Sequence, residues 1–337
     1  MSAPQETGTA TVGEYLVQWL AHMRGRVRPK THQGYESLIR VHALPALGGL
    51  GLADLTPLDL QRLYGALLES ELKLAAGTVL NLHLVLTQAL GQAERWGIVT
   101  RNVAQGAQPP RPRRPEPVVV DRALAARLLE EARGTRFELA VAIALCTGMR
   151  RGEILALRWS DLDDSLETAR VRRSLQTTLR MLSFEEPKTR RSRRAVALPE
   201  ILRPYLERQR ADQAERREAS TNWQDLDLVI DRGDGGPVNP DTVSSAWYRF
   251  CRQRGLPHVR FHDLRHAHAT LMLLQGVHPK IVSERLGHAS IGITLDLYSH
   301  VLPSMQEDAA RAFDELFEPT MDRGSGPDPL IASPAAP

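Results

Sequence analysis

Apolar side chains recur every three or four residues through the first third of the chain, which is the spacing of one face of an α-helix. Tyr15 and Trp19 belong to the first stripe, and Thr11 stands before it with Glu14 three residues later, as in a capping box. The pattern predicts a small all-helical domain over residues 11–103. Further stripes begin near Lys30, at Thr56-Pro57 and near Gly77-Thr78, with breaks expected at Pro45, at Gly48-Gly49 and at Trp96-Gly97.

The stretch Pro109-Pro-Arg-Pro-Arg-Arg-Pro-Glu-Pro117 interrupts this periodicity with five prolines. Because proline has a fixed φ and no N–H, we expect residues 104–120 to form an extended, semi-rigid linker that is not helical. Arg111, Arg113 and Arg114 are candidate contacts to a phosphate backbone, and a plain spacer is the competing interpretation.

A second, larger domain is predicted over residues 121–318, opening at Asp121, a favourable N-cap residue. The apolar run 139–145 predicts a buried helix, and another helix is expected after Gly152. The fold class is therefore expected to be mainly α with a small antiparallel β-sheet in the second domain. Strand-like segments are expected at 168–175 and 194–198, and further helices at about 201–219, 239–254, 263–274, 279–286, 291–297 and 304–317.

Composition is consistent with two globular domains, since the chain has 337 residues, 42% of them hydrophobic and 25% charged. The net charge is only +3, but between Arg170 and Arg194 nine basic residues stand against two glutamates. Such a local field attracts a phosphate backbone, and a solvated basic surface is the alternative interpretation.

The two cysteines imply neither a disulfide framework nor a zinc-type pair, which favours a reducing compartment. The N-terminal segment lacks a signal-peptide pattern, and no apolar run approaches membrane-spanning length. We therefore expect a cytoplasmic protein. Residues 1–10 and 319–337 are rich in small and polar residues, proline and glycine, and are expected to be disordered tails.

Four short motifs in the second domain carry the candidate chemistry: Thr147-Gly-Met-Arg-Arg-Gly-Glu153, Pro187-Lys-Thr189, His262-Asp-Leu-Arg-His266 and Leu286-Gly-His288, the last followed by Tyr298. They supply guanidinium, ammonium, imidazole and phenol groups. Arginine binds non-bridging phosphate oxygens bidentately, a phenol can act as a nucleophile, and lysine or histidine can protonate a leaving oxygen. The set therefore suits attack on a phosphodiester without a metal ion.

In this order and spacing the motifs resemble those of the tyrosine recombinases of the phage-integrase family, over residues from about 11 to about 317. The ending Arg95-Trp-Gly-Ile-Val-Thr-Arg-Asn102 of the first domain is also similar. The resemblance implies a SAM-like core-binding domain followed by a mixed α/β catalytic domain. It implies site-specific cutting and rejoining of DNA through a 3′-phosphotyrosyl intermediate, for integration or excision of a phage or other mobile element, with no cofactor.

Six residues are catalytic by this resemblance, with the tyrosine as nucleophile: Arg150, Lys188, His262, Arg265, His288 and Tyr298. Of the adjacent Arg150 and Arg151, the family's Thr-Gly-x-Arg pattern selects Arg150. Glu153 shares the helical face of Arg150 and is expected to orient a catalytic side chain. An ordinary carboxylate at a helix start is the alternative interpretation of Glu153.

Lys188 is one of only four lysines in an arginine-rich chain. Because lysine is rare here, its position between two predicted strands favours a specific role. Lysine can release its proton and arginine effectively cannot, which suits the general-acid role that the resemblance implies. An exposed lysine at the tip of a hairpin is the alternative interpretation of Lys188. Arg190 and Arg191 beside it are candidate DNA contacts. His262 and His266 have the spacing of helix-borne zinc ligands, but Arg265 between them disfavours a metal, so none is expected.

The resemblance implies double-stranded DNA attachment sites as partners, a homo-tetramer on synapsed DNA, a candidate excision or directionality factor, and no membrane. It also implies that the protein is nucleoid-associated when bound to DNA. The segment Ser304–Phe317 is expected to form an amphipathic helix that docks on a neighbouring subunit, with intramolecular packing as the alternative. With about ten residues before the first domain, we expect no separate arm-site domain.

Three other activities remain open. A type IB topoisomerase or telomere resolvase is disfavoured by the first domain, which resembles integrases. A chromosome-dimer-resolving recombinase is closer. A catalytically decayed, DNA-binding integrase relative is disfavoured because every position of the catalytic set is filled.

Overall fold

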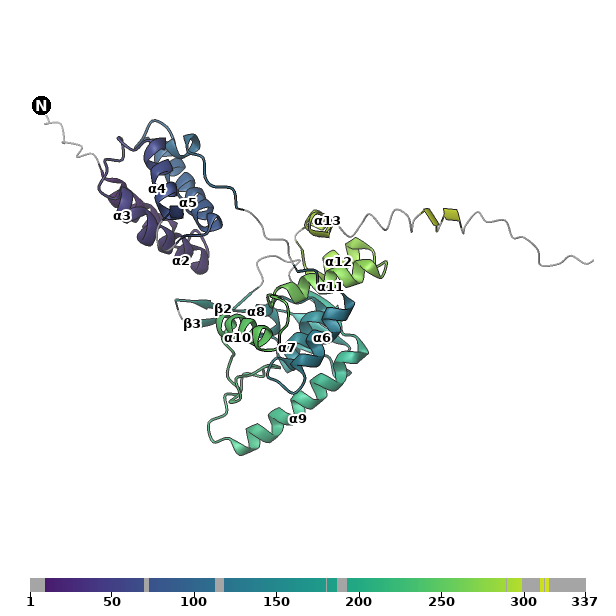
Figure 1. Ribbon diagram of the computed structural model, residues 1–337. Coiled ribbons are helices and arrows are strands. Elements are labelled where there is room, and N and C mark those ends of the chain that lie inside the picture. The colour runs from purple at the N-terminus through teal and green to yellow at the C-terminus, as the bar shows by residue number, and fades with distance from the viewer. Residues whose placement is uncertain are drawn as a thin grey trace, which may run out of the picture. The chain divides into compact units, whose positions relative to one another are not determined.

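The computed structural model of the chain describes residues 10–69, 73–112, 118–179, 181–186, 193–288, 290–298, 310–311 and 313–314 (Figure 1). The chain divides into two compact units. The first comprises Met1–Pro117 with Gln176–Ser183, and the second Val118–Leu175 with Phe184–Pro337. The fold is mainly helical, as the sequence predicts, and the described residues form two small two-stranded sheets where the sequence predicts one.

The first unit is a helical bundle around an apolar core. Helix α1 (Val12–Met23) begins with the predicted capping box, in which Thr11 and Glu14 bond each other's backbone N–H groups. Tyr15 and Trp19 are fully buried, and the Tyr15 hydroxyl donates to the carbonyl of Ala89 at 2.6 Å. The other helices of the bundle are α2 (Pro29–Leu38), α3 (Leu44–Leu47), α4 (Pro57–Glu69) and α5 (Ala76–Arg95).

The expectation that Pro45 ends the second helix is wrong. A π-helical turn, Ile39–Ala43, joins α2 directly to α3, and the N–H of Leu44 donates to the carbonyl of Ile39. The wider turn lets Pro45 fall in the first turn of α3, where a missing N–H is tolerated. The helix instead ends at Gly48-Gly49.

The proline-rich segment begins with a short helical turn. Val103–Gly106 forms a 3-10 helix that is capped by the Asn102 side chain, so the expectation that the linker is not helical from residue 104 is wrong there. The prolines begin only at residue 109, which leaves the preceding N–H groups free to close this turn. Arg111 is exposed, and Arg113 and Arg114 lie outside the described residues.

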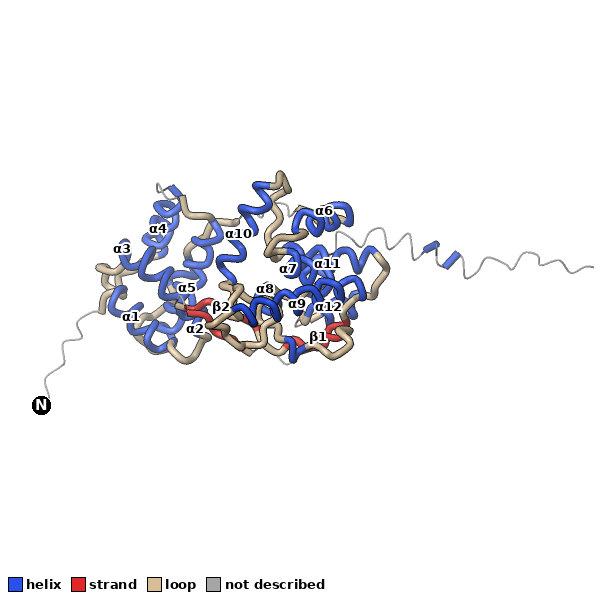
Figure 2. The backbone as a smooth tube through the Cα atoms, turned by 90° about the horizontal axis from the view of Figure 1, so that it is seen from below, coloured by secondary structure: helices blue, strands red, loops and turns tan. Residues whose placement is uncertain are grey.

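The second unit is built around α7 (Glu138–Thr147), whose side chains are buried almost all round. It packs against α6 (Arg122–Ala132), α9 (Arg203–Ala219) and α11 (Asp263–Leu274), which Figure 2 shows from below. Asp121 caps α6 as predicted, accepting from the N–H of Leu124 at 2.8 Å. The remaining helices are α8 (Arg151–Ile154), α10 (Pro240–Gln253), α12 (Pro279–Leu286) and α13 (Ile291–Tyr298).

The helix expected after Gly152 is only one turn long. Helix α8 ends at Ile154, and the carbonyl of Leu157 instead accepts from the N–H of Val229 at 2.9 Å. A backbone bond to a distant segment therefore replaces the continuation of the helix.

The strands differ from the prediction. The segment expected as one strand over 168–175 is two, β1 (Thr168–Val171) and β2 (Ser174–Thr178), and β3 (Met181–Glu185) was not predicted. β1 pairs antiparallel with β4 (Arg194–Ala197), with Val171 opposite Arg194, while β2 pairs with β3. The break falls at Arg172-Arg173, because both guanidiniums turn toward the buried Asp161.

Among the described residues, none of the helices has the length and apolar character needed to cross a membrane. The helix predicted over Ser304–Phe317 lies almost wholly outside the described residues.

Candidate active site

The turn between α7 and α8 places Arg150. Gly148 has φ +64°, and a Cβ there would lie 2.6 Å from side-chain atoms of both His268 and Leu286. Only glycine fits a left-handed turn packed this closely against α11 and α12. The chain therefore reverses within two residues, and Arg150 becomes the N-cap residue of α8.

Arg150 is held at three points. Its backbone N–H donates to Glu153 Oε2 at 2.9 Å, and its Nη1 donates to Glu153 Oε1 at 2.8 Å. Its Nη2 donates to the carbonyl of Gly287 at 3.1 Å. The side chain is still 38% exposed, so a fixed guanidinium presents one side to the solvent.

Arg265, in the first turn of α11, is held even more tightly. Its Nη1 donates to the carbonyl of Gly148 at 2.6 Å and its Nη2 to the carbonyl of Leu286 at 2.8 Å. The residue is only 4% exposed. Because both acceptors are neutral backbone groups, the positive charge of Arg265 is oriented without being cancelled by them.

His262 precedes α11 as its N-cap residue, and its ring meets the ring of His266 edge-on at 5.0 Å. Its pKa is lowered to about 4, first by desolvation and then by the positive charges of His266, Arg265 and Arg150. The described residues include no group of three or more metal-ligating side chains around this pair.

His288 follows Gly287, which ends α12 in the left-handed conformation at φ +67°. Its Nδ1 is 2.8 Å from the hydroxyl of the buried Thr294 on α13. Desolvation, followed by the charges of Arg265 and Arg150, lowers the pKa of His288 to about 4. A neutral imidazole whose Nδ1 is occupied by a hydroxyl leaves Nε2 for a ligand.

The structure thus brings together Arg150, Arg265, His262 and His288, four of the six residues predicted from the sequence. Tyr298 is the last residue of α13, and nothing is described of its side chain. Lys188, Arg190 and Arg191 lie outside the described residues.

Two contributors were missed in the sequence. Thr294 orients His288, but it lies in the apolar stretch of α13, where nothing marks its hydroxyl. Arg194 binds Glu153 with its side chain only 6% exposed, yet one arginine in a basic run gives no sign of burial. Motif spacing therefore marks the candidate catalytic residues and Glu153, which binds Arg150, but it misses Thr294 and Arg194.

Five residues of the predicted basic field line a groove of about 620 Å³ in the second unit, and the other four, Arg180, Lys188, Arg190 and Arg191, lie outside the described residues. Beneath it, Asp161 is 1% exposed and pairs with Arg173 at 2.8 Å. The groove continues to Arg194, next to the site, and its arginines are Arg158, Arg170, Arg172, Arg173, Arg193 and Arg194.

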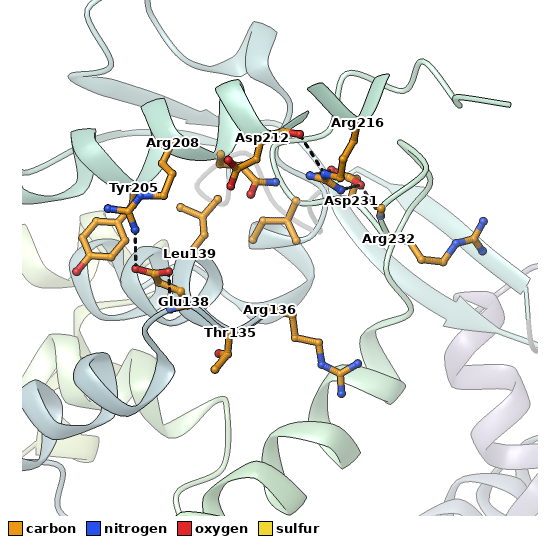
Figure 3. Close-up of a pocket in the computed structure, with 14 residues that line it drawn as sticks. Thr135, Arg136, Glu138, Leu139, Tyr205, Arg208, Asp212, Arg216, Asp231 and Arg232 are labelled. Carbon is orange, nitrogen blue, oxygen red and sulfur yellow. Dashed lines mark hydrogen bonds and ion pairs between the residues drawn. The ribbon is translucent and has the colours of Figure 1, made fainter. Parts of the chain in front are cut away.

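A separate hollow of about 440 Å³ lies between α9 and the start of α7 (Figure 3). Two ion pairs lie along it, Arg208 with Glu138 at 3.1 Å and Arg216 with Asp231 at 2.9 Å. The residues that line it include none of the six predicted catalytic residues. The cationic cluster, and not this hollow, is the site suited to a phosphodiester.

Comparison with known proteins shows the family to which the chain belongs. The model of the phage integrase family matches residues 119–305, and that of the phage integrase N-terminal SAM-like domain matches residues 11–68. The protein is a site-specific tyrosine recombinase of the integrase class. The chain belongs to the phage integrase family.

Proteins similar to the chain are recombinases and integrases of several bacteria. It is 27% identical over 329 residues to a XerC-like tyrosine recombinase of Caldanaerobacter subterraneus, covering 91% of this chain and 83% of that protein. It is 27% identical over 364 residues to an integrase of Saccharopolyspora erythraea, covering 89% and 82%. To the ICEBs1 integrase of Bacillus subtilis it is 33% identical over 180 residues, covering 53% and 49%.

Solved structures share the fold. The Tn1549 transposon integrase in complex with a circular intermediate DNA superposes with a TM-score of 0.77 at 21% identity, covering 90% of this chain and 99% of that one. The lambda integrase tetramer bound to a Holliday junction superposes with a TM-score of 0.64 at 18% identity, covering 86% and 83%.

Proposed function

We propose that this protein integrates and excises a mobile element by cutting and rejoining DNA at attachment sites, through a 3′-phosphotyrosyl intermediate. Residues 11–103 would serve as the core-binding domain and 121–318 as the catalytic domain, joined by the linker 104–120. The observation that carries the proposal is the pair Arg150 and Arg265, both fixed by backbone carbonyls and both next to two neutral histidines.

In the proposed reaction the phenol oxygen of Tyr298 attacks the scissile phosphorus and gives its proton to a solvent water. Arg150 and Arg265 bind the non-bridging oxygens, where negative charge grows in the transition state. His262 and His288 donate hydrogen bonds to the same oxygens. The bond to the 5′ oxygen breaks, and that oxygen takes a proton from Lys188.

The rejoining step reverses this sequence. The 5′ hydroxyl of a partner strand gives its proton to Lys188 and attacks the phosphotyrosyl link, and the phenol leaves and takes a proton from solvent. The energy of the phosphodiester is kept in the phosphotyrosine, so no nucleotide cofactor takes part. The charge that a metal ion would supply comes instead from fixed guanidiniums.

Two further features belong to the same proposal. Exchange between two duplexes needs four active sites, and the lambda integrase structure with a TM-score of 0.64 is a tetramer on a Holliday junction, which supports a homo-tetramer here. We also propose that the segment 304–317 docks on a neighbouring subunit and that a directionality factor selects excision. Deleting residues from Ser304 onward should then abolish the synapse while leaving cleavage by single protomers.

The test uses a half-site cut from the junction between the element and its host, found by sequencing the DNA that flanks the encoding locus. The full-length protein should form a covalent adduct with a substrate whose released fragment, which carries the free 5′ hydroxyl, diffuses away. Tyr298→Phe should bind the same DNA but give no adduct, and Tyr248→Phe is the matched control. Binding without an adduct in the wild-type protein would instead favour a decayed DNA-binding relative.

A second function, resolution of chromosome dimers, is kept because of the likeness to the XerC-like recombinase. It predicts recombination between two copies of a host chromosomal site. The proposed function predicts recombination only between the element's own junction and its target.

A further inference from the structure

The end of α12 collects three arginines. Arg194 Nε donates to the carbonyl of Arg285 at 2.5 Å, and Arg265 and Arg150 donate to the next two carbonyls, those of Leu286 and Gly287. The last carbonyls of a helix lack intrahelical partners and carry the negative end of its dipole. Helix α12 therefore offers three consecutive acceptors to three like-charged side chains.

Arg194 also reaches the carboxylate of Glu153. Its Nη2 donates to Oε2 at 2.9 Å and its Nη1 to Oε1 at 3.3 Å. The two side chains are 6% and 4% exposed, so the pair is buried. Glu153 thus stands between Arg194 on one side and Arg150 on the other.

The net charge next to Arg150 depends on this arrangement. If Glu153 had Arg150 as its sole cation, the pair would be neutral, and the attraction would draw Arg150 away from a phosphate. With Arg194 present, two guanidiniums share one carboxylate, and a net positive charge remains beside the solvent-facing side of Arg150. A buried carboxylate is also costly unless it is paired.

We propose that Arg194 is a positioning residue for strand cleavage, which neutralises Glu153 and ties β4 to the end of α12 so that Arg150 keeps its orientation and its charge for the scissile phosphate. The inference rests on the proposed function for its role in cleavage. The geometric evidence for the inference is the set of hydrogen bonds from Arg194 to Glu153 and to the carbonyl of Arg285. None of the four motifs described above includes Arg194.

The electrostatics of Glu153 agree with this geometry. Burial acts to raise the pKa of Glu153, yet the pKa is lowered overall, because the charge and hydrogen bonds of Arg194 come next, followed by those of Arg150. Arg194 therefore contributes more than Arg150 to keeping this carboxylate ionised.

The neighbouring residue provides a matched control. Arg193 carries the same charge one position earlier, but its side chain is 56% exposed and pairs with Glu186, which is 79% exposed. Arg193→Gln removes one positive charge from the same groove without touching Glu153 or α12. Any effect of charge loss on DNA binding should appear in both variants.

In single-turnover cleavage of the half-site, Arg194→Gln should lower the rate at saturating DNA roughly 100-fold, because a small misplacement of a catalytic group costs about that much. Its DNA affinity should change less than about three-fold. Arg193→Gln should leave the saturated rate within about two-fold. Arg194→Lys keeps a cation but cannot bind Glu153 and α12 together, and should recover part of the rate.

The pH profile separates positioning from general loss of structure. Without Arg194, the pKa of Glu153 should rise, so the acid limb of the Arg194→Gln profile should move up by about one pH unit. Glu153 faces two cations, Arg194 and Arg150, and the second remains in the variant. An unshifted profile, or equal rate losses in Arg193→Gln and Arg194→Gln, would overturn the inference.

A readout without DNA keeps this inference apart from the proposed function. Nitrogen NMR of the full-length protein, with Arg150 assigned by its loss in Arg150→Lys, should show separate Nη signals for its restrained guanidinium. They should persist in Arg193→Gln and merge in Arg194→Gln. If they persist in Arg194→Gln the inference is wrong, whereas a wild-type protein that forms no adduct refutes only the function.

Should Arg194→Gln fail to fold, the double variant Glu153→Gln with Arg194→Gln replaces it, because no uncompensated buried charge then remains. That protein should fold, give merged Arg150 signals and cleave slowly. Wild-type cleavage by the double variant would equally overturn the role given to Arg194.

Discussion

Arg150 donates from Nη2 to the carbonyl oxygen of Gly287 at 3.1 Å, which joins the turn after α7 to the end of α12 across 137 residues of sequence. Arg265 makes the complementary link, donating to Gly148 in the first element and to Leu286 in the second. The two arginines thus link the C-terminal ends of α7 and α12 to each other through hydrogen bonds. Disturbing either end should therefore displace both arginines.

Gly148→Ala tests the first of these ends. The new alanine would have to keep φ at +64°. Its Cβ would lie 2.6 Å from side-chain atoms of His268 and of Leu286. We expect a loss of about 2–4 kcal/mol in the free energy of unfolding, from strain and overpacking together, and loss of DNA cleavage. Chemical denaturation of the purified variant measures the first quantity.

Gly276→Ala is the control, since Gly276 also has a positive φ of +75° but a Cβ there meets nothing within 4 Å. It should cost only about 1 kcal/mol and leave cleavage intact. Equal costs at the two glycines would show that the close packing at Gly148 is unimportant.

Thr294→Val should impair His288 without harming the fold. The substitution keeps the shape of the side chain but removes the hydroxyl that lies 2.8 Å from Nδ1. The loss of one hydrogen bond should slow cleavage by roughly ten-fold. Thr294→Ser retains the hydroxyl and should keep most of the rate, so similar rates for the valine and serine variants would argue against this role of Thr294.

Arg265→Lys should fail although it preserves charge. The two nitrogens of Arg265 bind two carbonyls on different elements, and a single ammonium cannot satisfy both. We expect the cleavage rate to fall by roughly 100- to 1,000-fold, the usual effect of losing a transition-state donor. A lysine variant with near wild-type cleavage would remove Arg265 from the proposed phosphate clamp.

Acid should destabilise the protein through its buried histidine. Desolvation is the main cause that lowers the pKa of His268 to about 4, while its Nδ1 lies 2.7 Å from the carbonyl of Leu145 and its Nε2 accepts from Arg285. Between pH about 6.5 and about 4 the unfolded chain binds a proton that the folded chain does not. The free energy of unfolding should therefore fall as the pH drops through this window.

His268→Asn should make this dependence shallower, by at most about 1.4 kcal/mol per pH unit. Urea unfolding at several pH values between 7.5 and 4.5 measures the slope. An unchanged slope in the variant would mean that His268 does not take part.

Helix ends with local chemistry were predictable from the sequence. Thr11 and Asp121 cap helix N-termini through their side chains, and Gly287 ends α12 in a left-handed conformation that favours glycine. Helices α11 and α12 have the predicted bounds. The strands were harder, because β1 and β2 read as one run of mixed residues. Their separation depends on Asp161, which binds Arg173 from a segment earlier in the chain.

The candidate site shows the same division. Arg150, Arg265 and the two histidines were found because motif spacing marks them. Glu153, which binds Arg150, lies in the same motif and was predicted with it. The other partners that fix them are backbone carbonyls, which have no sequence signature, and Arg194, whose burial depends on tertiary packing.

Mass spectrometry of the covalent complex tests the central claim most directly. After trapping the protein on the half-site and digesting the DNA, the residual nucleotide should be attached to the peptide that contains Tyr298. Five other tyrosines provide internal controls: Tyr15, Tyr35, Tyr64, Tyr205 and Tyr248. Attachment at any of these, or at a serine, would contradict the account.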